Sequence, residues 1–204
     1  MSAQALLSAI AAIDPEAGPT PAQSGAILAA ADAMMAGKPA PDLTTAENST
    51  RLAGLWRTLF TTHGIERGYA TLQRMSWGHA KDTPVRSQSV HQFLDPARGK
   101  YLNIVQFGIE GGPLRGLHYA RAHVRFKPEA PDTFFVQFRE FEFAPTSDTP
   151  AEPFRDMVAG ADGALVFALP ETAPEFASPV AYLDDAFRFM RGSDDHFYVL
   201  RKVL

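Results

Sequence analysis

The sequence contains no cysteine. A disulfide framework, a thiolate metal site and a thiol nucleophile are therefore excluded. No apolar run approaches the roughly 20 residues that a membrane-spanning helix needs. The N-terminus also lacks the basic start and the apolar stretch of a secretory signal. We therefore expect a cytoplasmic protein, and peripheral contact with a membrane stays open.

Recognisable catalytic and metal-binding motifs are also missing. The six histidines are scattered and none forms a helical metal-binding pair. His118 and His123, five apart on a predicted strand, should point to opposite faces. The segment Gly108 to Gly112 lacks the spacing of a phosphate loop and indicates a hairpin turn. We expect no metal, no cofactor and no catalysis; the enzymatic alternative is a lipid-acting barrel with His123 or Asp184 as acid or base.

Charge is distributed unevenly along the chain, whose net charge is −4. Residues 51–127 carry 12 basic against 4 acidic side chains, a balance of +8, whereas residues 128–204 carry 6 against 14, a balance of −8. A basic middle segment is compatible with a partner such as anionic lipid or nucleic acid. Neutralisation between adjacent strands is the simpler interpretation. We therefore expect no nucleic-acid partner.

Residues 1–40 have the pattern of a helical lead-in. Residues 2–13 place apolar side chains on one helical stripe. Thr20 to Gln23 has the spacing of a capping box, with proline at the first helical position, and Gly37 to Pro39 is a stop signal. Both predicted helices are rich in alanine and apolar on one face. We expect them to pack on the domain that follows.

Residues 41–204 have the pattern of a β domain. The predicted strands cover residues 52–62, 70–77, 85–94, 101–109, 117–127, 133–143, 164–169, 181–190 and 196–203. Seven to nine short strands after a helical lead-in favour a mainly β (α+β) fold. The specific prediction is a closed antiparallel β-barrel, because closure removes the exposed edges of an open sheet. The proline-rich stretch 144–153 should form a long loop.

The first and last strands carry two informative features. Gly54-x-Trp56 resembles the entry strand of lipocalin-like barrels, in which an indole fills the barrel floor. A basic residue of the last strand can stack on that indole, a contact worth about 0.5 to 2 kcal/mol; Arg201 is the first candidate and Arg191 the second. Asp184 and Arg188 share one strand parity, which favours a structural ion pair. The functional alternative is an acid that orients a polar ligand head at the barrel mouth.

The segment 119–126 should be a two-faced strand. Period two places Tyr119, Arg121, His123 and Arg125 on one face and small or apolar side chains on the other. If the polar face lined the lumen, it would hold a carboxylate or carbonyl head group. Solvent exposure of this face is favoured, because burying two unpaired arginines is costly. The alanines would then leave room for an apolar chain.

Taken together, the segments resemble the plastid lipid-associated, or PAP/fibrillin, family. One similarity lies in the helical lead-in, two in the middle strands and two at the ends of the β domain. The segments concerned are Thr20 to Gln23, Leu52 to Thr62, Val90 to Asp95, Asn103 to Phe107, and Tyr182 to Gly192 followed by Phe197 to Leu200. The chain departs from the family pattern at Phe60, Phe187 and Phe189, where the larger or less polar rings should reshape the cavity. High alanine and proline content fits a bacterial member.

The resemblance implies a lipocalin-like barrel that binds or transports a hydrophobic small molecule without catalysis. The implied ligands are prenylquinones, carotenoids, fatty acids or other lipids. The alternative is a structural or scaffolding protein at lipid bodies or membranes, or beside a lipid-synthesis enzyme. The candidate ligand-binding residues are Trp56, Phe60, Tyr119, Arg121, His123, Arg125, Phe135, Asp184 and Arg188.

Overall fold

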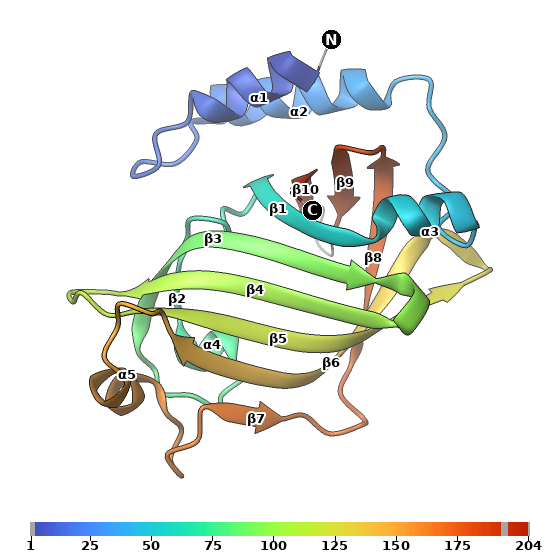
Figure 1. Ribbon diagram of the computed structural model, residues 1–204. Helices are drawn as coiled ribbons and strands as arrows, with labels where there is room; N and C mark the ends of the chain where they lie inside the picture. Colours follow the sequence, from blue (N-terminus) through green and yellow to red (C-terminus); the bar gives the residue numbers. More distant parts are fainter. Residues whose placement is uncertain (1–2, 193–195, 204) are drawn as a thin grey trace.

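Eight strands close into one antiparallel barrel in the computed structural model, which describes residues 3–192 and 196–203 (Figure 1). The order around the barrel is β1, β10, β9, β8, β6, β5, β4 and β3, and β3 pairs with β1 to complete the ring. This confirms the predicted closed antiparallel barrel. The strands are β1 (Gly54–Thr61), β3 (Pro84–Asp95), β4 (Lys100–Ile109), β5 (Arg115–Lys127), β6 (Ala130–Pro145), β8 (Glu175–Leu183), β9 (Phe187–Arg191) and β10 (Phe197–Lys202).

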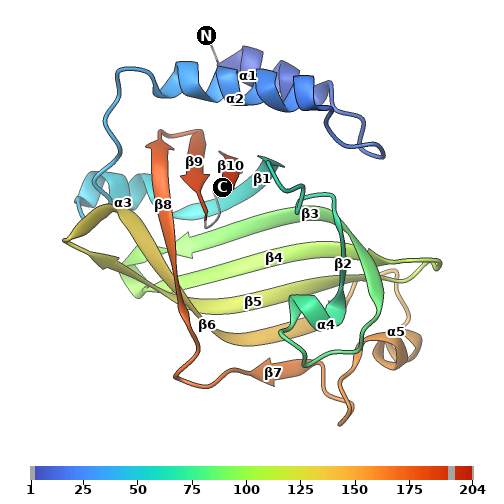
Figure 2. The same ribbon diagram turned by 180° about the vertical axis from the view of Figure 1, so that it is seen from behind.

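The barrel wall divides at one end, where two long strands change partner. One part of β3 pairs with β1, and its first residues pair with the short strand β2 (Tyr69–Thr71). In the same way, β6 pairs first with β8 and later with the short strand β7 (Val166–Ala168). A single helical turn, α4 (Leu72–Met75), follows β2 directly and lies beside it at this end (Figure 2). The wall is therefore interrupted between β1 and β2 along β3, and between β8 and β7 along β6.

Two helices, α1 (Ala3–Ala11) and α2 (Pro21–Met35), lie across the outside of the barrel (Figure 1). Their apolar faces share one buried cluster with side chains of β1, β8, β9 and β10. The predicted capping box is confirmed: the Thr20 hydroxyl accepts from the Gln23 N–H at 3.2 Å, and the Gln23 side chain accepts from the Thr20 N–H at 2.9 Å. The helices are thus held to the barrel by apolar packing. The domain boundary at residue 40 stays a prediction.

Three phenylalanines that depart from the family pattern belong to this same outer cluster. Phe60, Phe187 and Phe189 are buried against the helices. A register shift in β1 between Thr58 and Phe60 turns the Phe60 side chain away from the lumen. The expectation that these rings reshape the cavity is therefore wrong, because they fill the space between barrel and helices.

Several predicted elements differ from the structure. Residues 70–77 are not one strand, because the Thr71 hydroxyl caps α4 after only three strand residues. Residues 181–190 are split between β8 and β9 by a turn at Asp184. The stretch 144–153 is only partly a loop, since α5 (Ala151–Val158) begins inside it and buries Phe154. Besides α4 and α5, two further short helices were not predicted: α3 (Ala46–Leu52), capped by Thr45, and the single 3₁₀ turn η1 (Pro96–Arg98).

The predicted hairpin at Gly108 to Gly112 is confirmed, since β4 ends at Ile109 and β5 begins at Arg115. Cross-strand neutralisation is also observed: Arg121 pairs with Glu140 and Glu142 of the neighbouring strand. Within residues 3–192 and 196–203, none of the helices is long and apolar enough to span a bilayer.

Candidate functional site

Two adjoining cavities occupy the interior of the barrel. The first has a volume of about 370 Å³ and the second about 500 Å³. Four side chains line both of them: Ile65, Asn103, Val105 and Phe138. We refer to the two cavities together as the lumen. The shared lining places the two cavities next to each other inside the barrel.

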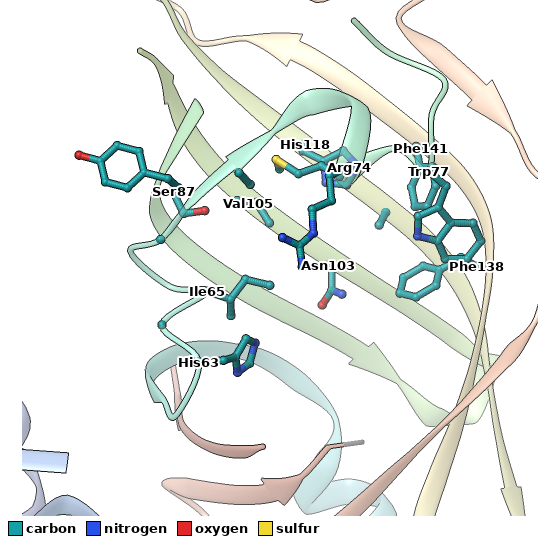
Figure 3. A pocket seen from close by; sticks show the side chains of 16 residues that line it. His63, Ile65, Arg74, Trp77, Ser87, Asn103, Val105, His118, Phe138 and Phe141 are labelled. Atoms are coloured by element: carbon teal, nitrogen blue, oxygen red, sulfur yellow. The ribbon is translucent and has the colours of Figure 1, made fainter. Parts of the chain in front are cut away.

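The first cavity lies between the strand wall and α4 (Figure 3). Inward side chains of β3, β4, β5 and β6 form its wall, and the segment 63–77 forms its cover. Ala120 contributes the small side chain that the two-faced strand predicted, and His118 lies beside it on β5. Figure 3 shows the Arg74 side chain reaching from α4 into this cavity. The lining is otherwise mainly apolar and aromatic.

His118 is the most deeply buried titratable group of the first cavity. Its side chain is 5% exposed and packs against the rings of Phe141 and Phe143, with centroid distances of 5.4 and 4.7 Å. Its Nε2 has no hydrogen-bond partner among the described residues. Burial disfavours the charged imidazolium and lowers the pKa of His118 to about 4. The imidazole is therefore neutral at physiological pH. His123 lies on the opposite, exposed face, as predicted.

Trp77 covers the first cavity from the solvent side. It packs at ring distances of 5.1 to 5.9 Å against Phe138, Phe141 and Phe176. Its backbone has a φ of 53°, in the left-handed region that non-glycine residues rarely adopt. Such strain persists only where surrounding packing fixes it. The indole is therefore held at the point where β6, β8 and α4 meet.

Exposed apolar side chains line the part of the lumen that is open to solvent. Ile65 and Tyr69 come from the segment before α4, Trp77 follows α4, and Phe176 belongs to β8. All four line one or both cavities while remaining open to solvent, and Tyr69 is 65% exposed. We call these four residues the mouth. They leave an apolar rim where the barrel wall divides.

The second cavity has a more polar lining at its inner end. Thr58, Gln92, Tyr101 and Asn103 lie there on β1, β3 and β4. The Tyr101 hydroxyl donates to the Asn103 side-chain oxygen at 2.6 Å. The Thr58 hydroxyl is buried and has no partner among the described residues. Burial raises the pKa of Tyr101, so its hydroxyl stays protonated.

The barrel floor next to this cavity contains the predicted indole and a cation, but the cation is a different residue. The guanidinium carbon of Arg188 lies 4.9 Å from the ring centre of Trp56, and the ammonium of Lys202 lies 5.3 Å from it. The predictions of Arg201 or Arg191 are wrong. Inward residues of β10 alternate, so Arg201 lies on the outer face opposite Arg57. Trp56 itself donates to the Leu52 carbonyl at 2.9 Å.

Arg188 is fully buried, with 0% exposure. Its Nη2 donates to the side-chain oxygen of Gln92, while its Nε and Nη1 have no partner within the described residues. The predicted ion pair with Asp184 is wrong. Arg188 points into the barrel, whereas the Asp184 carboxylate accepts from the N–H groups of Ala186 and Phe187 and closes the turn between β8 and β9.

None of the nine predicted ligand-binding residues lines either cavity. Tyr119, Arg121, His123 and Arg125 lie on the outer face of β5, as solvent exposure predicted. Phe135 also faces outward, with the Lys127 ammonium 3.8 Å from its ring centre. Trp56 and Arg188 form the floor next to the second cavity. A ligand-binding role for these nine residues stays a prediction.

The lining residues that were missed fall into two classes. Gln92, Asn103 and His118 are polar residues at inward positions of β3, β4 and β5. Strand parity counted from buried neighbours such as Tyr101 would have placed them inside. Trp77 and Arg74 carry no such signal, because α4 interrupts the strand pattern.

Comparisons with known proteins give the following findings. The family model PAP_fibrillin matches residues 2–201. A solved crystal structure of a lipocalin-like protein from Bacteroides uniformis is similar, with 14% sequence identity and a TM-score of 0.34; the match covers 75% of this chain and 99% of that chain. No curated protein matches.

Proposed function

This chain belongs to the PAP/fibrillin family, and from that premise we propose that it binds and carries a hydrophobic small molecule in its barrel without catalysing a reaction. The family match confirms the resemblance across nearly the whole chain. The proposed ligands are prenylquinones, carotenoids, fatty acids or other lipids.

The observation that supports this proposal is the pair of adjoining cavities inside the barrel. Volumes of about 370 and 500 Å³ fall in the range typical of small-molecule sites. Such sites are mostly apolar, with a few placed polar groups. The lumen matches that description: Val105, Ala120 and Phe138 lie beside Asn103, Gln92 and a few other polar residues.

The mouth supports a second proposed role, which is contact with the lipid surface that supplies the ligand. Soluble proteins rarely expose several large apolar side chains close together, and such a patch typically marks an interaction site. We propose that the mouth contacts a membrane or lipid body from which the ligand enters. A purely scaffolding protein would use this contact and leave the lumen empty.

The test blocks the lumen where its two cavities meet. Val105 lines both cavities, and Val105→Phe should fill their junction. Ile104→Phe, one residue away on the outer face of β4, is the matched control, because it adds the same ring outside. The wild type and both variants are purified from the native host, and the organic extract of each purified protein is analysed by mass spectrometry.

We expect a stoichiometric apolar compound with the wild type and with Ile104→Phe, and at least a tenfold loss with Val105→Phe. An empty extract from all three folded proteins would contradict the carrier role and favour scaffolding. Equal loading of the two variants would place the ligand outside the lumen.

A further inference from the structure

A buried cation without a counter-ion lies behind the inner end of the second cavity. Arg188 is fully buried, and two of its nitrogens have no hydrogen-bond partner in the part of the chain that the structure describes. Desolvating an unpaired charge is costly, and such charges normally have a carboxylate partner. Asp184 does not supply one, because it closes the β8–β9 turn. The fold thus leaves a positive charge here uncompensated.

The ring systems around Arg188 offset only part of this cost. The ring centres of Trp56 and Phe134 lie 4.9 and 5.7 Å from the guanidinium carbon of Arg188, within cation–π range. Burial lowers the pKa of Arg188 to about 9, so the side chain is still protonated at neutral pH. The ammonium group of Lys202 also contacts the Trp56 ring and is a second cation at the barrel floor. The floor of the barrel is therefore electropositive.

Polar groups that line the second cavity are arranged as donors, and one of them, Gln92, contacts Arg188 directly. Gln92 uses its side-chain oxygen to accept from Arg188, and Asn103 uses its own to accept from Tyr101. Each amide thereby leaves its NH₂ group for a ligand, since an amide carries one oxygen and one NH₂. The Thr58 hydroxyl, which lines the same cavity, has no partner among the described residues and is a third donor. All three residues line the second cavity.

We propose that the inner end of the second cavity binds the carboxylate of a long-chain apolar acid, with Gln92, Asn103 and Thr58 as donors and Arg188 as the charge behind them. This inference rests on the proposed function and names the ligand class for the same lumen. A carboxylate only accepts hydrogen bonds and carries the missing charge. A neutral quinone or alcohol would leave that charge uncompensated. The apolar chain would extend past Val105 and Phe138 toward the mouth.

The lumen wall also contains one carboxylate, Glu175, and one further arginine, Arg74. Glu175 lines the second cavity, but Lys127 and Arg125 hold its carboxylate at 2.6 and 2.7 Å. Arg74 reaches into the first cavity from α4 and is exposed. It is the rival anion site, so the experiment must separate it from Arg188.

The experiment compares palmitic acid with 1-hexadecanol, which has the same chain length and a neutral head. Dissociation constants are measured by calorimetry on the full chain at pH 7.5. In the wild type we expect the acid to bind at least tenfold more tightly than the alcohol, as charge-assisted hydrogen bonds give. Arg188→Met should abolish that preference while alcohol binding persists. Arg57→Met, on the outer face of β1, and Arg74→Met should both keep it.

A second variant covers the case in which Arg188→Met does not fold. The double variant Arg188→Met with Gln92→Leu leaves no orphaned acceptor, and replacing a buried polar set by apolar side chains of similar volume is often tolerated. Equal binding of acid and alcohol by the wild type would overturn this inference and leave the proposed function standing. Loss of the preference in Arg74→Met alone would also overturn it. Failure of both compounds to bind would also overturn this inference, whereas the carrier role itself is decided by the organic extract of the native protein.

Discussion

Replacing His118 should remove an acid-sensitive part of the protein's stability. The folded state holds this imidazole neutral, with a pKa of about 4 against an ordinary value of 6.5. Between these two values the unfolded chain binds a proton that the folded chain does not. The stability contributed by the neutral imidazole is therefore complete above pH 6.5, falls as the pH drops through 6.5, and levels off below about 4.

The size of the effect follows from the two pKa values. Linkage gives a loss of about 2 kcal/mol in the free energy of unfolding between pH 7.5 and pH 5, and about 3 kcal/mol by pH 4. A loss of 2 kcal/mol is a large share of the 5 to 15 kcal/mol that typical domains have. His118→Phe is the natural substitution, because the side chain already packs against the rings of Phe141 and Phe143.

The assay is urea denaturation of the wild type and His118→Phe at several pH values from 7.5 to 5. Carboxylates titrate in both proteins and cancel in the difference, so only the divergence of the two curves is interpreted. His123→Asn, on the exposed face of the same strand, controls for the loss of a histidine. We expect the wild type to lose about 2 kcal/mol more than His118→Phe over this range. Parallel curves for the two proteins would refute a buried neutral imidazole at this position.

Two further predictions concern packing and capping. Gly116→Ala should destabilise the fold by about 1 to 3 kcal/mol, because the added Cβ would lie 2.5 Å from Phe154 and 2.6 Å from Phe107. Gly112→Ala, where nothing lies within 4 Å, is the control, and equal melting temperatures for the two would contradict the tight approach. Thr20→Ala should cost about 1 kcal/mol by removing the capping box of α2, measured by urea denaturation, while Thr20→Ser should retain most of the stability. No difference between these two would mean that the cap does not contribute.

Basic residues of segment 51–127 pair with acidic residues of segment 128–204 in the barrel wall. The basic β5 faces the acidic β6 and the first residue of β8, through pairs such as Arg121 with Glu140 and Arg125 with Glu175. Exposed pairs of this kind contribute little individually. Together they neutralise the uneven charge of the sequence locally on the surface. Arg188 differs, because it is buried inside the barrel and has no carboxylate partner among the described residues.

Local patterns in the sequence determined most of the fold. Strand periodicity and turn residues predicted the long strands, and the spacing of Thr20, Pro21 and Gln23 predicted α2, because these signals act between close neighbours in the chain. Parity along 119–126 placed the arginines of β5 outside and Ala120 inside. The family resemblance was carried by residues of these same segments and was confirmed by the family match.

The tertiary structure decided which residues meet in the lumen. Arg188 contacts Trp56 and Gln92 only because β9 lies near β1 and β3 in the closed ring, which no local pattern specifies. A one-residue register shift in β1 turned Phe60 outward, and α4 replaced the end of a predicted strand and placed Trp77 over the first cavity. The physical reason is that strand alternation fixes relative faces along one strand, whereas barrel closure, bulges and capped turns fix which face becomes the inside.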